Sequence, residues 1–207
     1  FDTNQNEIFK DFRFYYDCLM GPNSRSVIQA IKKINKLPQV NVIAVGHGPI
    51  LKEYVNSWKD NYFEWSNNKS KGNEFVAVCY ISDYGFCDRL SQSLSHGISK
   101  ADAQVQLIDL RSSDSQELTA LISESKAVVI PTWPQNADSE LQESIGTLFA
   151  ALKPKQFTAV YDAFGGNDEP IDSLANKLRE LKQKEALSPL RVREIPDPKI
   201  YQQFEEA

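Results

Sequence analysis

Residues 75 to 87 read Phe75-Val-Ala-Val-Cys-Tyr-Ile-Ser-Asp-Tyr-Gly-Phe-Cys87, an apolar run that leads directly into a polar turn. Residues 75–80 have the continuous apolar character of a buried parallel strand. In a doubly wound sheet, the turn after the first strand can offer backbone N–H groups and a helix N-terminus to an anion. Residues 82–87 occupy that turn and predict a phosphate-binding segment. The alternative is a plain connection between a strand and a helix that binds no ligand.

The sequence downstream repeats the pattern of a strand followed by a helix. Apolar segments of strand length occur at residues 75–80, 105–110, 127–130, 157–161 and 190–195. Helical segments follow them at residues 88–99, 115–124, 139–152, 169–186 and 198–206. This alternation predicts an α/β fold, a five-stranded parallel sheet with helices on both faces, because right-handed crossovers place helices on the two sides. We assign residues 74–207 to this doubly wound domain.

The first 65 residues follow a different pattern. An apolar stripe with helical period predicts a helix over residues 26–37, and a second helix is expected over residues 51–65. Val40 to Val45 predicts a buried strand, and the aromatic residues upstream form an irregular stretch. So few elements cannot bury a core of their own, so residues 1–65 are expected to belong to a larger domain. Residues 66–73 contain no apolar side chain and predict a linker.

The composition argues against several classes of partner. Among 207 residues, 28 acidic and 23 basic side chains give a net charge of −5, which disfavours binding to nucleic acid and to anionic membrane surfaces. No apolar stretch has the length of a membrane span. The three cysteines lack a CxxC spacing, which argues against a disulfide framework and against a structural zinc site. We expect a fragment of a soluble, cytoplasmic protein.

The turn at residues 82–87 resembles the flavodoxin fingerprint: a hydroxyl residue, any residue, Thr or Tyr, Gly, any residue, then Thr. In flavodoxins this segment cradles the phosphate of FMN. Ser82, Tyr84 and Gly85 match the pattern, and Phe86 takes an unrestricted position. Cys87 replaces the final hydroxyl residue, and a thiol donates hydrogen bonds poorly.

A carboxylate inside this turn, that of Asp83, adds a second departure from the flavodoxin pattern. It would repel a phosphate dianion unless the side chain points to solvent. We therefore expect FMN to bind more weakly than in an ordinary flavodoxin.

Flavodoxin-like domains build the walls of the flavin site from the loops after the third and fourth strands. In the third-strand loop, Trp133 is the candidate to stack on the ring. The candidates for the polar edge of the ring in that loop are Pro131, Thr132 and Asn136. In the fourth-strand loop, Phe164 is the candidate second wall. The other candidates in that loop are Asp162, Ala163, Gly165 and Gly166.

A second motif, Gly46-His47-Gly48-Pro49, follows the predicted strand of the first segment. An imidazole held between glycines is a common way to aim a metal ligand into a cleft, although a lone histidine often has a structural role. From Tyr15-Tyr16-Asp17-Cys18 through His47 to the flavodoxin-like segment, the chain resembles flavodiiron proteins of the cyanobacterial diflavin type. The resemblance implies that residues 1–65 are the C-terminal portion of a metallo-β-lactamase-like domain. It also implies a flavodoxin-like sheet order 2-1-3-4-5 and identifies His47 as the last ligand of a di-iron centre, with Gly46 replacing the usual Ser.

The same resemblance implies an activity. In flavodiiron proteins, electrons pass through FMN to the di-iron site, which reduces dioxygen to water or, in some members, nitric oxide to nitrous oxide. Members form head-to-tail dimers, and cyanobacterial members add a flavin reductase domain that delivers the electrons. The family's other iron ligands have no counterpart in this sequence, and Asp2 is only a remote candidate, so the fragment alone is expected to be inactive.

Two alternatives remain open from the sequence. One is a flavodoxin-like electron carrier in which the N-terminal residues only pack. The other is a subunit that has lost its cofactors and forms a hetero-oligomer with an active homologue.

Overall fold

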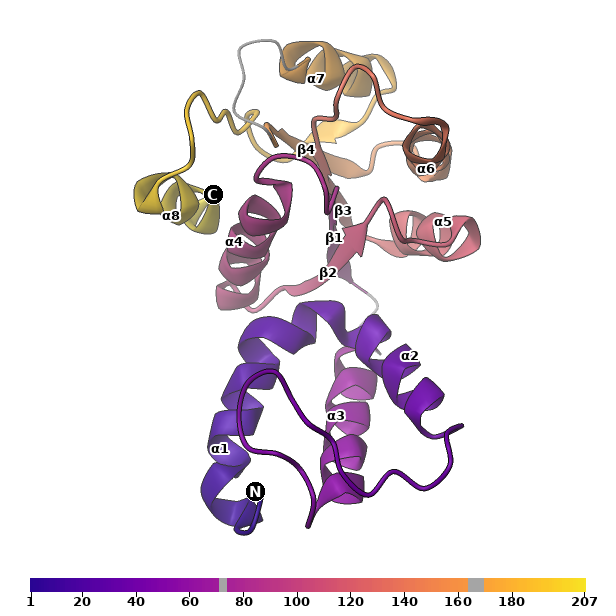
Figure 1. Cartoon of the computed structure of the whole chain (residues 1–207). Coiled ribbons are helices and arrows are strands. Elements are labelled where there is room, and N and C mark those ends of the chain that lie inside the picture. Colours follow the sequence, from indigo (N-terminus) through magenta and orange to yellow (C-terminus); the bar gives the residue numbers. More distant parts are fainter. Residues whose placement is uncertain (71–73, 164–169) are drawn as a thin grey trace. The chain divides into compact units, whose positions relative to one another are not determined.

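The computed structural model describes residues 1–70, 74–163 and 170–207, and the chain divides into two compact units, Phe1–Gly72 and Asn73–Ala207 (Figure 1). The division falls inside the segment for which the sequence predicts a linker. Residues 66–70 instead belong to the helix Val55–Ser70, in which Ser66 is fully buried, so the linker prediction is wrong for them. Residues 71–73 lie outside the described residues. None of the helices in the described part of the chain has the length and apolarity to cross a membrane.

The second unit is built on a parallel sheet. Its strands are β1 (Phe75–Tyr80), β2 (Gln104–Asp109), β3 (Ala127–Pro131), β4 (Phe157–Tyr161) and β5 (Lys184–Glu185). They lie in the order β2-β1-β3-β4-β5, and every neighbouring pair is parallel. This confirms the predicted α/β fold and the strand order 2-1-3-4-5.

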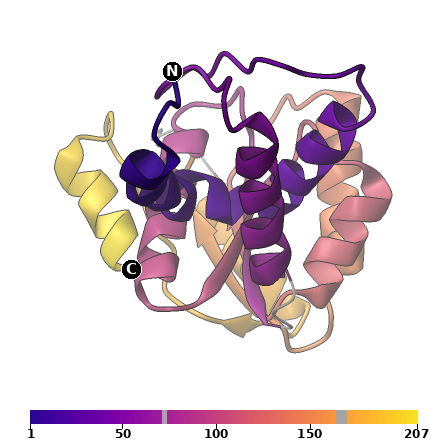
Figure 2. The same ribbon diagram turned by 90° about the horizontal axis from the view of Figure 1, so that it is seen from below.

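Helices cover both faces of this sheet. They are α4 (Cys87–Lys100), α5 (Ser115–Glu124), α6 (Ser139–Ala151), α7 (Ile171–Glu180) and α8 (Pro198–Glu206). Figures 1 and 2 show α4 and α8 on one face, with α5 and α6 on the other. Asp114, Asp138 and Asp197 cap α5, α6 and α8 by accepting hydrogen bonds from backbone N–H groups of the first turn. These caps explain why the three helices begin at the predicted positions.

The core of the second unit lies between the sheet and its helices. Ala77, Val78 and Cys79 in the middle of β1 expose no surface. Leu90 of α4 and Leu118 of α5 are also fully buried. A strand that is covered on both faces needs apolar residues at successive positions, which is why β1 is a continuous apolar run.

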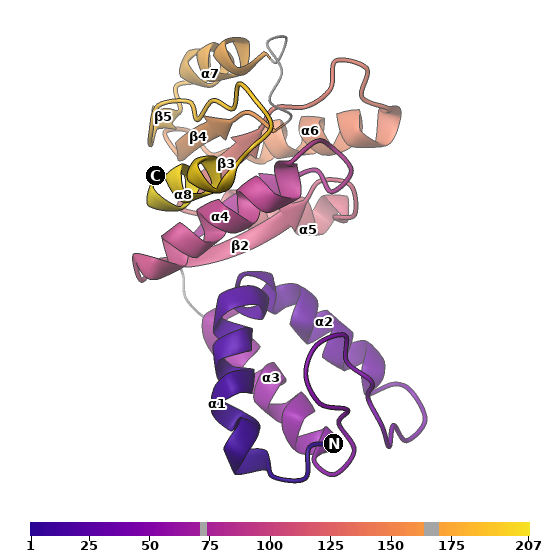
Figure 3. The same cartoon turned by 60° about the vertical axis from the view of Figure 1, so that its left-hand side comes forward.

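The last strand differs from the prediction. The fifth strand is Lys184–Glu185, which pairs with the start of β4 (Figure 3). The predicted strand 190–195 is confirmed only at Leu190, which forms an isolated parallel bridge to Tyr161, and residues 191–195 form no strand. The predicted helix 169–186 ends at Glu180, since Lys182 turns the chain with a positive φ of 58°. This edge strand is defined by backbone pairing with β4 and not by apolarity of its own.

The first unit is helical. Its elements are α1 (Gln5–Tyr15), the π-helical turn η1 (Tyr16–Met20), the 3₁₀ turn η2 (Gly21–Asn23), α2 (Ser24–Ile34) and α3 (Val55–Ser70). The stretch predicted to be irregular is therefore α1 and η1. The predicted strand Val40 to Val45 is also wrong: Ile43 forms one isolated bridge to Leu51, and Val42 is 49% exposed. An apolar run forms a strand only beside a partner that satisfies its backbone, and the described residues of this unit offer no such strand.

An aromatic cluster holds the first unit together. Tyr16 and Trp58 are buried, and the ring of Phe12 stacks on Trp58 at a centroid distance of 4.2 Å. Oη of Tyr16 lies 2.9 Å from Oγ of Ser66, and its ring centroid lies 5.2 Å from that of Trp65. The unit thus has a small core, contrary to the expectation that so few elements could not bury one.

Candidate functional site

The loops that follow β1, β3 and β4 meet at one edge of the sheet. We call residues 82–87, 131–136 and 162–163 the carboxyl rim. The three strands are adjacent and parallel, so their carboxyl ends lie together. The amide of Phe86 donates to the carbonyl oxygen of Ala163 at 2.8 Å, and the amide of Ala163 donates to Oγ1 of Thr132 at 2.9 Å. The structure therefore joins one residue from each of the three loops that the sequence singles out.

The turn after β1 is held in shape by its own backbone. Gly85 adopts a left-handed conformation with φ 56°, which lets the chain turn into α4. The amide of Tyr84 donates to Ile81, and that of Cys87 donates to Tyr84, each at 3.1 Å. The amides of Asp83 and Gly85 meet no acceptor among the described residues. These two N–H groups are available to an anion, so the turn meets the basic requirement of a phosphate site.

The side chain of Cys87 is directed inward and is fully buried. Its Sγ accepts a hydrogen bond from the amide of Ile81 at 3.1 Å and lies 3.2 Å from Oη of Tyr161. Tyr161 donates its one hydroxyl proton to the carbonyl oxygen of Cys79 at 2.8 Å, so the thiol supplies the proton of the Cys87–Tyr161 contact. Burial raises the pKa of Cys87 to about 12 and keeps the thiol protonated. The Cys87 side chain thus ties the turn to β4.

A cation in the loop after β2 connects the turn to α6. Arg111 donates through Nε to Oδ1 of Asp83 at 2.9 Å and through Nη1 to Oδ2 of Asp138 at 2.5 Å. Asp138 also caps α6 by accepting from the amide of Leu141. This bond, followed by the Arg111 contact, holds the pKa of Asp138 below its ordinary value. Asp83, the carboxylate predicted to disturb a phosphate, is 59% exposed and ion-paired.

A further carboxylate reaches the turn from the end of β2. Asp109 accepts hydrogen bonds from the amide of Ser82 at 3.3 Å, from the amide of Arg111 at 3.0 Å and from the hydroxyl of Ser112 at 3.1 Å. Neither Asp109 nor Arg111 stands out in the sequence. Asp109 ends the second strand and Arg111 follows it, and this position is the signal that could have found them, since parallel strands end at the same edge.

The loop after β3 supplies an aromatic side chain with support from α6. Thr132 and Pro131 are buried, whereas Asn136 is exposed. Trp133 is partly buried, and its ring meets that of Phe149 edge-on at a centroid distance of 6.1 Å. The indole is therefore braced, as an aromatic wall of a ligand site requires.

The loop after β4 is anchored through a carboxylate. Asp162 is buried, its Oδ2 accepts from the amide of Val192 at 3.1 Å, and its amide donates to Leu190 at 2.9 Å. Ala163 is buried as well. The remaining candidates of this loop lie outside the described residues: Phe164, Gly165 and Gly166.

His47 lies in an exposed turn of the first unit, where Gly48 has a positive φ of 95°. The turn borders a cavity of 620 Å³ whose lining includes Asp11, Tyr15 and Tyr62. The imidazole centroid lies 6.5 Å from the ring centroid of Tyr15. Within the described ranges, no three His, Cys, Asp or Glu side chains gather into a group that would hold a metal ion.

Asp2, the remote candidate for a metal ligand, is buried and engaged with the backbone. Its carboxylate accepts from the amides of Lys52 at 2.7 Å and of Glu53 and Tyr54 at 2.9 Å. Burial on its own would raise the pKa of Asp2, but these donors outweigh it and the pKa lies below its ordinary value. Asp2 therefore has a structural role just before α3.

No protein-family model matches the chain. The chain is 40% identical, over all 207 residues, to a Synechocystis protein named diflavin flavoprotein A 1. A solved flavodoxin-like domain from Synechococcus is also 40% identical, with a TM-score of 0.60 over 63% of this chain and 91% of that one. A metal-soaked flavodiiron core from Synechocystis is 29% identical and has a TM-score of 0.83 over 100% of this chain and 51% of that one.

The chain spans 36% of the length of the Synechocystis diflavin flavoprotein, so it corresponds to about a third of that relative. The flavodiiron core is matched by the whole chain, first unit included. The sequence identity and the structural match confirm the resemblance stated from the sequence. The chain therefore belongs to the diflavin flavoprotein family and is similar in structure to a flavodiiron core.

Proposed function

We propose that this chain is part of a flavodiiron oxidoreductase in which electrons pass through FMN to a di-iron site that reduces dioxygen to water. The observation that carries the proposal is the carboxyl rim, where Phe86, Ala163 and Thr132 link three loops at the ligand-binding edge of a doubly wound sheet. The name of the Synechocystis relative, a diflavin flavoprotein, supports a flavin as the ligand. FMN, when bound, supplies a carrier that exchanges electrons singly or in pairs.

The residues of the rim would divide the task of holding FMN. The turn 82–87 would bind the phosphate through backbone N–H groups, among them those of Asp83 and Gly85. Trp133, braced by Phe149, would form one wall of the ring site. Phe164 would form the second wall.

The first unit would serve the metal centre. In this proposal residues 1–65 are the C-terminal portion of a metallo-β-lactamase-like domain, and His47 is one ligand of the di-iron centre. The match of a flavodiiron core to the whole chain supports this assignment. The relatives are longer than this chain. In this proposal, other segments of the full-length protein complete the iron site, and a flavin reductase domain delivers the electrons. A head-to-tail dimer in the cytoplasm would place the flavin of one subunit beside the irons of the other.

The first experiment is a titration of the chain with FMN, monitored by flavin absorbance at about 450 nm and by flavin fluorescence. We expect saturable binding with a dissociation constant above the nanomolar range, because carboxylates surround the turn. Trp133→Ala should weaken binding roughly tenfold by removing an aromatic wall. Phe157→Ala is the matched control, since Phe157 is an exposed aromatic residue at the opposite end of β4. Absence of saturable binding would refute the flavin site.

The second experiment concerns the metal and the reaction. The iron content of the full-length protein should correspond to two ions per subunit, and His47→Ala should lower it. In an oxygen electrode, the full-length protein should consume dioxygen when its flavin is reduced, whereas the 207-residue chain should not. A full-length protein that binds FMN but no iron would instead be a flavodoxin-like electron carrier.

A second candidate function is a subunit without cofactors that pairs with an active homologue. The observation in its favour is that the Asp109 carboxylate accepts a hydrogen bond from the amide of Ser82 in the turn. That amide is therefore already bonded and is not left for a phosphate. A full-length protein that binds neither flavin nor iron, yet forms a stable complex with a purified active homologue, would select this function.

A further inference from the structure

The phosphate-binding turn lies among negative charges. Asp83 is inside the turn, Asp88 follows in the first turn of α4, and the Asp109 carboxylate accepts a hydrogen bond from Ser82. A phosphate dianion placed beside these groups would meet like charges, which weaken its binding. A site of this composition therefore needs a compensating cation.

Arg111 is positioned to compensate. Its side chain is 22% exposed and bridges Asp83, which is 59% exposed, and Asp138, which is 56% exposed. The planar guanidinium of an arginine can donate hydrogen bonds to two carboxylates at once in a fixed geometry. The ammonium group of a lysine holds two carboxylates less firmly. The hydrogen bonds to Asp138 and Asp83 raise the pKa of Arg111 further, so the side chain stays charged.

We propose that Arg111 determines the preference of the rim for a phosphorylated flavin. By pairing with Asp83 and tethering it towards the start of α6, Arg111 cancels the charge inside the turn and leaves the amide donors to the ligand phosphate. Arg111 is thus a specificity-determining residue for FMN over riboflavin, which has the same ring without the phosphate. This inference rests on the proposed flavin site and deepens it.

The rival explanation is that Arg111 only holds two loops together. In that case its loss would disturb the ring site and the phosphate site alike, and both flavins would bind more weakly. A role in charge compensation acts on the phosphate alone, and it disappears when Asp83 is made neutral. The two explanations therefore differ in ligand dependence and in the effect of a second substitution.

The test measures dissociation constants of FMN and riboflavin for the 207-residue chain and for Arg111→Gln, Asp83→Asn and the double variant. Arg111→Gln should weaken FMN binding roughly tenfold, while riboflavin binding changes less than about twofold. The double variant should recover FMN affinity to within roughly threefold of the unmodified chain. Arg111→Lys, which keeps the charge but not the fork, should give an intermediate FMN affinity.

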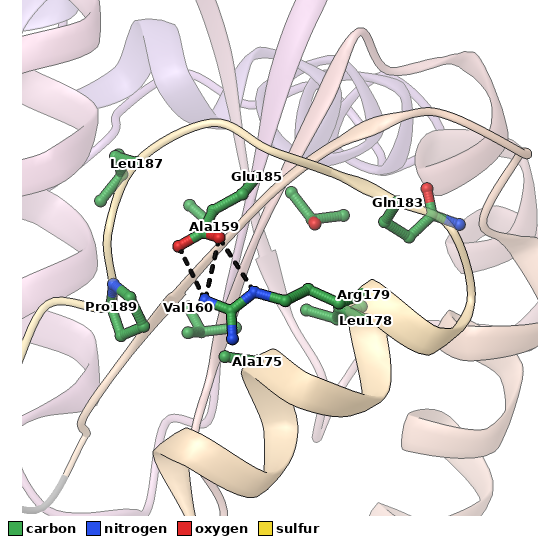
Figure 4. A pocket seen from close by; sticks show the side chains of 10 residues that line it. Ala159, Val160, Ala175, Leu178, Arg179, Gln183, Glu185, Leu187 and Pro189 are labelled. Carbon is green, nitrogen blue, oxygen red and sulfur yellow. Dashed lines mark hydrogen bonds and ion pairs between the residues drawn. The ribbon is translucent and has the colours of Figure 1, made fainter.

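Two controls separate charge compensation from general effects. Arg179 forms another ion pair of the same unit, with Nη2 2.9 Å from Oε2 of Glu185 in a pocket beside α7 (Figure 4). Because β5 pairs with the start of β4, this pair lies at the opposite end of the strand, and Arg179→Gln should leave both flavin affinities unchanged. Arg89→Gln removes an exposed cation from the first turn of α4 and should cost less FMN affinity than Arg111→Gln.

The outcomes separate the role of Arg111 from the proposed flavin site. Equal weakening of both flavins by Arg111→Gln, unchanged FMN affinity, no recovery in the double variant, or an equal loss in Arg89→Gln would each overturn the role of Arg111. Failure of the unmodified chain to bind either flavin would refute the proposed function and, with it, this inference. Thermal unfolding of every variant shows whether a loss of affinity comes from loss of folding.

Discussion

Cys87 is the residue that departs from the flavodoxin pattern. Its side chain is buried in the core of the second unit and is not exposed at the surface of the turn. The thiol is enclosed and contacts the Ile81 amide and the Tyr161 hydroxyl. A thiol tolerates such an apolar setting better than a residue that needs strong hydrogen bonds, because it behaves as a small hydrophobic group. At the scale of single residues, the substitution therefore concerns the stability of the turn, and in the proposed site a phosphate would be bound by the backbone.

We predict that Tyr161→Phe destabilises the second unit by about 1–2 kcal/mol. The change removes the donor to the Cys79 carbonyl oxygen and the partner of the Cys87 thiol, both in the buried core. Thermal unfolding followed by circular dichroism measures the loss. Tyr201→Phe, in a partly buried tyrosine of α8, is the control, and the prediction fails if both variants unfold at the temperature of the unmodified chain.

We predict that the first unit loses stability in acid through Asp2. Its pKa is lower in the folded state than in the unfolded state, so its contribution is fully present above about pH 4 and is lost as pH falls through the folded-state pKa. Asp2→Asn should cost about 2 kcal/mol at pH 7 and progressively less below about pH 4. Urea unfolding followed by tryptophan fluorescence measures the difference. Glu53→Gln, which removes an exposed carboxylate and keeps the Glu53 amide, should show no such dependence, and a pH-independent cost of Asp2→Asn would contradict the prediction.

The helix α8 is docked on α4 at a point where only glycine fits. A Cβ added at Gly97 would lie 1.9 Å from the carbonyl oxygen of Glu205. The side chain of Glu205 also binds Lys100 and lies 3.1 Å from Nδ1 of His96. Phe204 packs edge-on against Tyr161 at a centroid distance of 6.0 Å. At the scale of elements, the close approach of the α4 and α8 backbones thus sets the position of α8. The Phe204 side chain of α8 in turn packs against β4.

We predict that Gly97→Ala lowers the stability of the second unit by about 1–3 kcal/mol, because the backbone of α8 must move away. The matched control is Gly146→Ala in α6, where an added Cβ meets no atom within 4 Å. That change should stabilise the unit by about 0.5–1 kcal/mol through helix propensity. Thermal unfolding of the two variants should shift in opposite directions, and shifts of the same sign would contradict the close approach.

The whole molecule consists of two units with separate cores. The first core is the aromatic cluster around Tyr16 and Trp58, and the second lies around the sheet. The second unit is similar in fold to the Synechococcus flavodoxin-like domain, whose structure was solved as a domain on its own. At this scale, the chain joins two bodies that each have their own source of stability.

We predict that residues 74–207 fold and bind FMN without the first unit. Their unfolding temperature should match that of the second unit in the 207-residue chain, because the buried residues of the sheet domain all belong to that segment. The FMN affinity should agree within about twofold with that of the longer chain. Calorimetry and flavin titration of both proteins provide the measurement. Failure of residues 74–207 to fold would show that the first unit is required.

Most of the second unit could be predicted because its information is local. Successive apolar residues mark strands that are covered on both faces, so the alternation of strands and helices and the three loops of the rim could be anticipated from the sequence itself. The sheet order was predicted only through the family resemblance. The family resemblance likewise rested on short motifs.

Other features depended on contacts between residues far apart in the chain. Val40 to Val45 had the apolarity of a strand but lacked a partner strand, and Lys184–Glu185 became one by pairing with β4. Arg111 pairs with Asp83 and Asp138, each more than twenty residues away in the sequence. Strand pairing and ion pairing are properties of two groups that the fold brings together. The sequence could indicate that Arg111 lies near the carboxyl edge of the sheet, but not which carboxylates it meets.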